Sequence, residues 1–172
     1  PITTTSYFAF AISVLFTAKI SSRLYQRALE PSSVWLTHYA SACYMNTWKP
    51  SPKELRAARD KTIPDVITGG LDVIFCGINP SLYSAAVGHH FARPGNRFWP
   101  TLHGAAYTDR LLSPFEDHLL LDFGCGLTNM AARATARADE LSVDELEDGA
   151  HKLEKKLKRH RPGCIAFLGI TA

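Results

Sequence analysis

One loop of this sequence carries residues that could bind and act on a ligand, the run Gly77-Ile78-Asn79-Pro80-Ser81. Gly77 permits a tight turn, while Pro80 fixes its own φ and restricts the residue before it. Successive backbone N–H groups in such a turn can converge on an anionic or carbonyl-bearing ligand. Asn79 supplies a hydrogen-bond donor and an acceptor but cannot act as a base. The loop is therefore typical of a ligand-binding turn, with a purely structural turn as the alternative.

A second polar and aromatic stretch follows closely in the chain. Its two segments are Gly88-His89-His90-Phe91 and Pro94-Gly95-Asn96-Arg97-Phe98-Trp99. They predict a loop punctuated by glycine and proline that leads into a helix with an aromatic face, and we assign the closing Phe-Trp pair to packing. The two histidines are adjacent, so their side chains diverge and do not form a metal-binding pair. They either line a pocket or contact DNA, or they make structural hydrogen bonds.

Short apolar runs bounded by glycines predict the strands that position these loops. They are Leu71–Cys76, a second strand near Leu119–Asp122 that enters Gly124–Asn129, and Cys164–Leu168. Strands that alternate with helices imply parallel pairing and right-handed crossovers, so we expect an α/β domain with helices on both faces of the sheet. Ligands of such sheets bind beyond the carboxyl ends of the strands, where the Asn79 loop lies.

Two capping boxes mark the starts of helices. Ser51-Pro52-Lys53-Glu54 predicts a helix of about two to three turns that continues through Leu55–Arg59. Ser142-Val143-Asp144-Glu145 predicts a longer helix that ends before Pro162. The charged run His151–Arg161 is expected to be the solvated face of this second helix, with a DNA-binding surface as the alternative.

The composition is that of one ordinary globular domain. Of the 172 residues, 46% are hydrophobic and 20% are charged, which excludes a disordered or fibrous chain. The net charge of +3 is too small to establish a nucleic-acid partner. The four cysteines lack metal-ligand spacing, and three of them are expected to be buried thiols in a reducing, intracellular compartment: Cys76, Cys125 and Cys164.

Residues 1–48 stand apart from this orderly pattern. They begin at Pro1 and include the apolar run Tyr7–Phe16, which is shorter than the roughly 20 residues of a membrane span and lacks a basic flank. A packed element, a poorly ordered extension and the end of a targeting segment or anchor all remain open. We therefore divide the chain into an extension of unknown role at 1–48 and one α/β domain at 49–172.

Taken together, the motifs resemble the mismatch-specific uracil/thymine-DNA glycosylase family. The resemblance covers residues 71–172, reaches back towards residue 49, and rests on Val73–Pro80, Gly88–Phe91, Pro94–Trp99, Gly126–Met130 and Thr135. It implies a uracil-DNA glycosylase fold, a three-layer α/β/α sandwich on a short parallel sheet. It also implies a DNA repair enzyme that flips a base out of double-stranded DNA. Such an enzyme hydrolyses the N-glycosidic bond of uracil, thymine or a modified base in a G·U or G·T mispair.

The same resemblance implies the setting of the enzyme and the roles of its residues. The enzyme would be a monofunctional monomer of the bacterial-type cytoplasm or the nucleus, with no cofactor, no metal and no membrane partner. Asn79 would hold the attacking water, Phe91 would stack on the flipped base, and Arg93 and Arg97 would contact DNA phosphates. The other base-binding residues would be Ile78, Pro80, Ser81, Ser84, His90, Asn129 and Thr135.

Each of these roles has a structural alternative. Phe91 is then a core residue, Arg97 is the partner of a carboxylate, and Asn129 and Thr135 are loop residues. If the roles hold, the backbone N–H groups of residues 78–81 stabilise charge that develops on the uracil oxygen. Since no aspartate stands in the place of Asn79, the bond breaks largely by departure of the base as an anion.

Two departures from the family pattern bear on this interpretation. The loop of the family usually has glycine where Ser81 stands, and we expect the serine side chain to narrow the approach to the base. The chain ends at Ala172, before the Asn-Pro-Ser-like loop that wedges into the duplex in the family, so we expect the fold to be incomplete at its C-terminus. The alternative function is a catalytically inactive, truncated fragment that binds DNA or a base. A nucleotide-binding α/β protein is disfavoured because no glycine-rich phosphate-binding motif follows the first strand.

Overall fold

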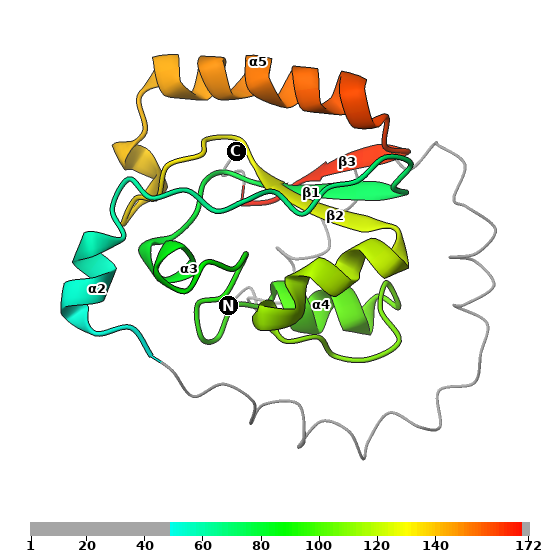
Figure 1. Cartoon of the computed structure of the whole chain (residues 1–172), viewed down its shortest axis with the longest axis horizontal. Coiled ribbons are helices and arrows are strands. Elements are labelled where there is room, and N and C mark those ends of the chain that lie inside the picture. Colours follow the sequence, from blue (N-terminus) through cyan, green and yellow to red (C-terminus); the bar gives the residue numbers. More distant parts are fainter. Residues whose placement is uncertain (1–48, 170–172) are drawn as a thin grey trace, which may run out of the picture.

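A computed structural model describes residues 49–169, and the predictions for 1–48 and for the end of the chain lie outside the described residues. The elements, with η for a 3-10 helix, are α2 (Pro52–Ala57), β1 (Val73–Gly77), α3 (Leu82–Val87), α4 (Phe98–Gly104), η2 (Pro114–Phe123), β2 (Cys125–Asn129), η3 (Ala138–Glu140), α5 (Val143–His160) and β3 (Cys164–Phe167). Figure 1 shows their arrangement around a small sheet.

The three strands form one parallel sheet in the order β2-β1-β3. Val73 at the start of β1 pairs with Cys125 of β2 and with Cys164 of β3. Every residue of the central strand β1 is buried, as expected for a parallel strand that is covered on both faces. At the other end of β1, Gly77 pairs with Asn129, so the carboxyl ends of β1 and β2 lie at one edge of the sheet.

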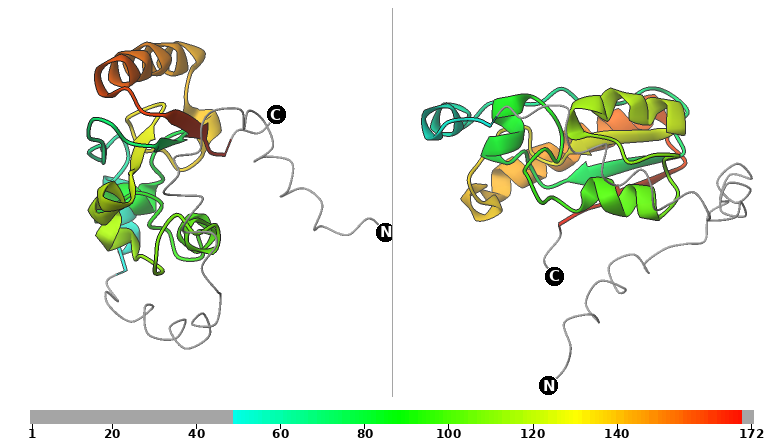
Figure 2. Two further views of the ribbon diagram at one scale, coloured as in Figure 1. Left: turned by 90° about the vertical axis from the view of Figure 1, so that its right-hand side faces the viewer. Right: turned by 90° about the horizontal axis from the view of Figure 1, so that it is seen from below.

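Helices cover both faces of this sheet. Helix α5 lies on one face, while α3, α4 and η2 lie on the other, as the views in Figure 1 and Figure 2 agree. Phe75 of β1 packs edge-on against Phe98 and Tyr107, with ring centroids 5.5 Å apart in each pair. Trp99 is buried in the same core cluster. The expected α/β class with helices on both faces is therefore confirmed, and so is packing for the Phe-Trp pair.

The second strand is not where the sequence predicted it. Residues Leu119–Asp122 belong to the 3-10 helix η2, and the strand is Cys125–Asn129 instead. Ser113 begins η2 with a capping box that includes Glu116, and the left-handed Gly124 (φ 70°) ends it. The apolar run Leu119–Leu121 therefore belongs to a helix, because the Ser113 cap and the left-handed Gly124 set the start and end of that helix.

Both predicted capping boxes are present, but the first helix is shorter than predicted. Ser51 caps α2 and Ser142 caps α5, each with the reciprocal glutamate bond. Helix α2 has only six residues because Asp60 adopts a left-handed conformation (φ 63°) and its N–H donates to Ala134 O at 3.0 Å. The chain therefore turns onto the loop after β2 instead of continuing as a helix. The predicted stop of α5 before Pro162 is confirmed.

The three cysteines of the described residues lie on the strands and differ in burial. Cys76 and Cys125 are buried as predicted, and burial raises the pKa of each thiol to about 12. The prediction is wrong for Cys164, which is exposed. Both β2 and β3 are edge strands, but Val66 pairs with Leu127 along the outer edge of β2, whereas the residues of β3 are at most half-buried. Among residues 49–169, no helix is both long enough and apolar enough to cross a bilayer.

Candidate active site

The site lies where two parallel strands end side by side. Beyond the last strand pair, the backbone ladder continues into the loops, since the N–H groups of Met130 and Ala131 donate to the carbonyls of Gly77 and Ile78, both at 2.8 Å. The loop after β1 and the loop after β2 therefore form one hydrogen-bonded wall at the carboxyl edge of the sheet. This is the place where ligands of parallel α/β sheets bind.

Asn79 is held in this wall by its side-chain amide. Its Nδ2 donates to the backbone carbonyl of Arg133 at 3.0 Å and to Oγ1 of Thr135 at 2.7 Å. Thr135 is 1% exposed and donates its own hydroxyl to Arg137 O at 2.6 Å, so towards Asn79 it can only accept. Both amide hydrogens are thus used, and Oδ1 accepts no hydrogen bond from the described residues. The site therefore presents an acceptor oxygen in a fixed orientation.

Three residues from the predicted motifs, Gly77, Phe91 and Asn129, lie close together at the carboxyl edge of the sheet. A Cβ atom on Gly77 would lie 2.6 Å from Oδ1 of Asn129 and 3.5 Å from the ring of Phe91. Phe91 has a left-handed backbone (φ 52°), a conformation that bulky residues rarely adopt. Its ring stacks on Phe98 with centroids 4.3 Å apart and an angle of 25° between planes. Phe91 is therefore both part of the aromatic cluster and a neighbour of Asn129 and Gly77.

The two serines of this region hold backbone. Ser81 caps α3, since its Oγ accepts from the N–H of Ser84 at 3.1 Å. The buried hydroxyl of Ser84 accepts from the N–H of Ala92 at 3.1 Å and contacts Ser81 Oγ at 3.1 Å. Ser84 thus ties the loop that carries Phe91 to α3. The hydroxyl of Ser81 has the local role of a helix cap, which the sequence analysis did not assign to it.

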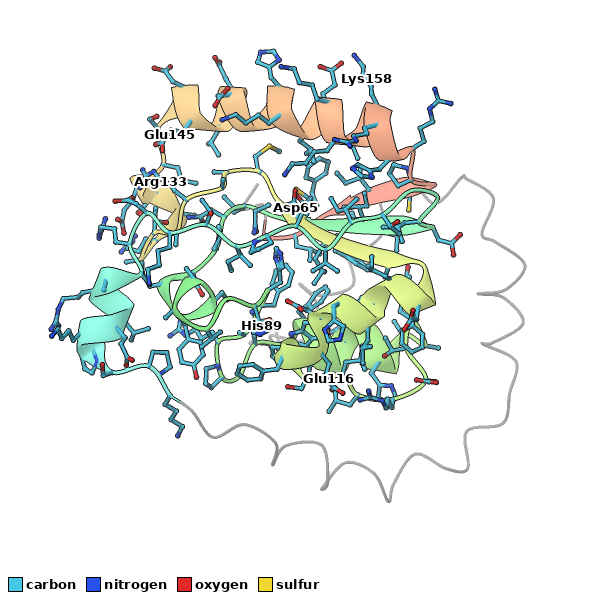
Figure 3. All side chains as sticks on the ribbon, viewed as in Figure 1. Asp65, His89, Glu116, Arg133, Glu145 and Lys158 are labelled. Atoms are coloured by element: carbon cyan, nitrogen blue, oxygen red, sulfur yellow. The ribbon has the colours of Figure 1, made fainter. Side chains whose placement is uncertain are left out.

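The adjacent histidines both contact Asp117, and His90 also contacts Pro64. His90 is 2% exposed, its Nε2 lies 2.9 Å from Pro64 O, and its backbone N–H donates to Asp117 Oδ2 at 3.2 Å. Burial lowers the pKa of His90. Because the carbonyl of Pro64 can only accept, Nε2–H is the donor in this contact. His89 places Nδ1 3.2 Å from Oδ1 of Asp117 and lies on the α3 side of the sheet in Figure 3. These contacts favour the structural interpretation of His90, whereas Nδ1 of His89 is buried and has no hydrogen-bond partner among the described residues.

The remaining predicted residues lie around the rim. Arg93 and Arg97 are exposed, in the loop before α4 and at its N-cap. Pro80 is buried, and its carbonyl accepts from the N–H of Thr135 at 3.3 Å. Ile78 is half-buried and accepts through its backbone, as described above. The residues 49–169 contain no cluster of three His, Cys, Asp or Glu side chains that could hold a metal ion.

Sequence reasoning missed one residue that contacts Asn79. Arg133 accepts the Asn79 amide through its carbonyl, while its guanidinium pairs with both carboxylate oxygens of Glu145 in the first turn of α5. Figure 3 labels this pair at one end of α5. The ion pair and the cap of Ser142 lower the pKa of Glu145 to about 2. The capping box marked the glutamate, but no local signal in the sequence identifies its arginine partner.

A cleft of about 690 Å³ adjoins this region on the α5 side. It lies between α5 and the two segments 62–65 and 129–133, and Asn129 and Arg133 line part of it. Lys156 at its wall pairs with Asp65 at 2.6 Å and donates to the buried hydroxyl of Thr128 at 3.2 Å. The cleft is thus lined by charges of both signs and does not select one sign of ligand.

A three-layer α/β/α domain with a preoriented amide at the carboxyl edge of its parallel strands belongs to the class of α/β proteins that bind ligands at that edge. The family model of the uracil DNA glycosylase superfamily matches residues 64–172, more than half of the chain. The chain therefore belongs to the uracil DNA glycosylase superfamily. Members of this superfamily are DNA glycosylases, hydrolases of DNA repair, and membership suggests a uracil-DNA glycosylase-like function with DNA as the partner.

Proposed function

We propose that this protein is a mismatch-type glycosylase that hydrolyses the N-glycosidic bond of uracil opposite guanine in double-stranded DNA. The observation that carries the proposal is the orientation of Asn79, whose Nδ2 is held by Arg133 O and Thr135 Oγ1. Its Oδ1 is left to accept from a water molecule. Thymine and modified bases opposite guanine are the further substrates of the same proposal.

The chemistry needs a base outside the helix. Flipping costs a few kcal/mol and least for a mispaired base, which favours a G·U pair over A·U. The flipped ring is placed against Phe91, and stacking on an aromatic side chain is worth about 1–3 kcal/mol per base. In this proposal Asn129 hydrogen-bonds the edge of the base, which is supported by the nearness of its Oδ1 and of the Phe91 ring to Gly77.

Bond cleavage then follows from what Asn79 can and cannot do. An amide does not take up a proton at neutral pH, so it orients the water without deprotonating it. The glycosidic bond breaks with its electron pair on the uracil, and the water oxygen bonds to the sugar C1′. The proton released by the water passes to the departing base or to solvent. Backbone N–H groups of residues 78–81 stabilise the negative charge on the uracil oxygen, as in an oxyanion hole.

Single-turnover base release tests this proposal. The chain is incubated with duplexes that contain G·U, G·T or A·U and with single-stranded uracil, and abasic sites are detected as alkali-labile breaks. We expect the fastest release from G·U and a loss of about 100-fold in the Asn79→Ala variant, since a misplaced reactant costs that much. Asn96→Ala is the matched control, because Asn96 is exposed and caps only Phe98 N–H.

Two outcomes would overturn it. Equal release by the wild-type chain and Asn79→Ala removes the role of Asn79. No release from any substrate by a chain that unfolds cooperatively removes the catalytic function, and binding of the G·U duplex without release would then indicate a protein that only recognises the mispair.

A further inference from the structure

We propose that Arg133 is a positioning residue for Asn79, and that the ion pairs of its side chain hold its backbone carbonyl where it orients the Asn79 amide. This inference rests on the proposed function. Arg133 touches no reacting atom in it and acts only through Asn79. The two are 54 positions apart in the chain and meet through the 3.0 Å hydrogen bond from Nδ2 to the carbonyl.

The guanidinium of Arg133 joins three separate segments. It pairs with Glu145 in the first turn of α5, donates to the carbonyl of Glu140 in η3 at 2.9 Å, and donates to Asp60 after α2 at 3.1 Å. The Arg133 side chain is 29% exposed, and its bonds to Glu145 and Glu140 are partly shielded from water, whereas the Asp60 side chain is 63% exposed. A bidentate arginine–carboxylate pair is among the strongest and most directional side-chain contacts. Together the contacts fix the side chain at several points and leave the residue little freedom to rotate.

Backbone hydrogen bonds extend this anchoring to the neighbouring residue. Ala134 accepts from the N–H of Asp60 at 3.0 Å and donates to Lys61 O at 2.8 Å. The segment that contains Arg133 is thus held by its side chain to Asp60 and by the next residue's backbone to the same turn. The Arg133 carbonyl lies between these attachments, so its place depends on both.

The position of the Arg133 carbonyl matters because the side-chain amide of Asn79 has a donor end, Nδ2, and an acceptor end, Oδ1. With one hydrogen on Thr135 Oγ1 and the other on Arg133 O, Nδ2 has to face the loop and Oδ1 has to face the site. A shift of the carbonyl leaves Thr135 as the single partner that orients Nδ2. The flipped amide would present two donors to the water and no acceptor, and the water could then not be oriented for attack. The ion pairs of Arg133 therefore select the productive orientation of Asn79.

The chain contains a matched control for this arrangement. Arg110 also makes a bidentate pair with the glutamate of a capping box, at 2.7 and 3.1 Å to Glu116, and Glu116 accepts from Ser113 N–H as Glu145 accepts from Ser142 N–H. Arg110→Gln removes the same charge and the same kind of ion pair as Arg133→Gln. It does so at η2, with no contact to Asn79 among the bonds of the described residues.

The experiment has one readout that does not depend on activity. The side-chain N–H signals of Asn79 are identified in ¹H–¹⁵N NMR spectra by their loss in Asn79→Asp, and their hydrogen exchange is measured in the whole chain. We expect slow exchange in the wild-type chain and in Arg110→Gln, and fast exchange in Arg133→Gln. Single-turnover uracil release is measured alongside and is expected to fall roughly 10- to 100-fold in Arg133→Gln with unchanged affinity for the G·U duplex.

Each outcome decides the matter. Unchanged Asn79 signals in Arg133→Gln, or equal changes in Arg133→Gln and Arg110→Gln, overturn the inference. A wild-type chain that releases no uracil but shows the exchange difference refutes the proposed function and leaves the positioning in place. If Arg133→Gln does not fold, Arg133→Lys and Glu145→Gln replace it, since both weaken the ion pair and keep the capping box. We then expect faster exchange of the Asn79 amide than in the wild-type chain for both variants, and wild-type exchange in both would overturn the inference.

Discussion

The side chain of Asn129 occupies the space in front of Gly77, because its Oδ1 lies 2.6 Å from the position that a Cβ on Gly77 would take. The paired register of the two residues at the ends of β1 and β2 brings them together. Glycine is needed at position 77 for this close approach rather than for its backbone conformation, since the φ angle of Gly77 is not positive. The size of one methyl group therefore decides whether Asn129 and Phe91 can share the site.

Gly77→Ala is expected to abolish most base release while the fold survives. The added methyl group displaces the Asn129 side chain or the Phe91 ring, and overpacking of this kind costs about 1–3 kcal/mol. The free energy of unfolding from urea titration and the single-turnover rate measure the two effects. Gly69→Ala is the control, because a Cβ there meets nothing within 4 Å. A Gly77→Ala chain as active as the wild type would show that Asn129 and Phe91 do not form the pocket as proposed.

Ser81 is expected to contribute stability through the cap of α3. Ser81→Ala removes the acceptor for Ser84 N–H, and the loss of such a cap costs about 1 kcal/mol, whereas glycine at an N-cap costs only a few tenths. Urea unfolding of the two variants compares these losses. A free energy of unfolding that is lowest in Ser81→Ala, higher in Ser81→Gly and highest in the wild-type chain supports the cap. A Ser81→Gly chain that is less stable than Ser81→Ala contradicts it.

The local parts of this fold could be predicted, and the parts that depend on distant contacts could not. The capping boxes at Ser51 and Ser142 signalled correct helix starts because a cap needs only residues three apart. The sequence predicted the second strand near Leu119–Asp122, but the strand is Cys125–Asn129, and a Cβ on its Gly126 would lie 2.9 Å from Val66 O. That glycine is required by the close packing of a neighbouring segment, which the order of residues does not reveal.

The candidate site divides in the same way. Asn79, Phe91, Asn129 and Thr135 were named from their motifs, and the structure brings them to one edge of the sheet. Their partners are largely backbone carbonyls, such as that of Arg133, and a carbonyl has no signature in a sequence. His90 was named as a pocket residue, but its ring nitrogen is directed to Pro64 O from 26 positions away.

The burial of His90 predicts a loss of stability in acid. Burial lowers the pKa of His90 from its ordinary value of 6.5, so the folded chain favours the neutral ring. The contribution to stability is complete above pH 6.5 and is lost as the pH falls towards the folded-state pKa, because the unfolded chain binds the proton first. His90→Gln, which keeps a donor for Pro64 O, is expected to flatten the decline in free energy of unfolding as the pH falls below 6.5. His151→Gln, at an exposed position on α5, is the control, and an equal slope in all three chains would contradict the prediction.

The thiols are expected to differ in reactivity. In a Cys43→Ser background, Ellman's reagent should modify the exposed Cys164 in the native chain and reach Cys76 and Cys125 only after unfolding. Burial raises the pKa of both of these thiols to about 12, so their thiolate populations are negligible at neutral pH. Burial also raises the pKa of Cys164, and its modification should therefore accelerate towards alkaline pH. Rapid modification of all three thiols in a folded chain would contradict this prediction.

The hydrogen bond from Asn79 to Thr135 joins residues 56 positions apart, across the long connection between two parallel strands. Such a contact forms only after a large loop has closed, which is the slow, entropically costly kind of step in folding. A chain in which only the helices with capping boxes have formed has no oriented Asn79. Uracil release during refolding should therefore recover later than the helical signal, and an isolated peptide of either loop would have no function.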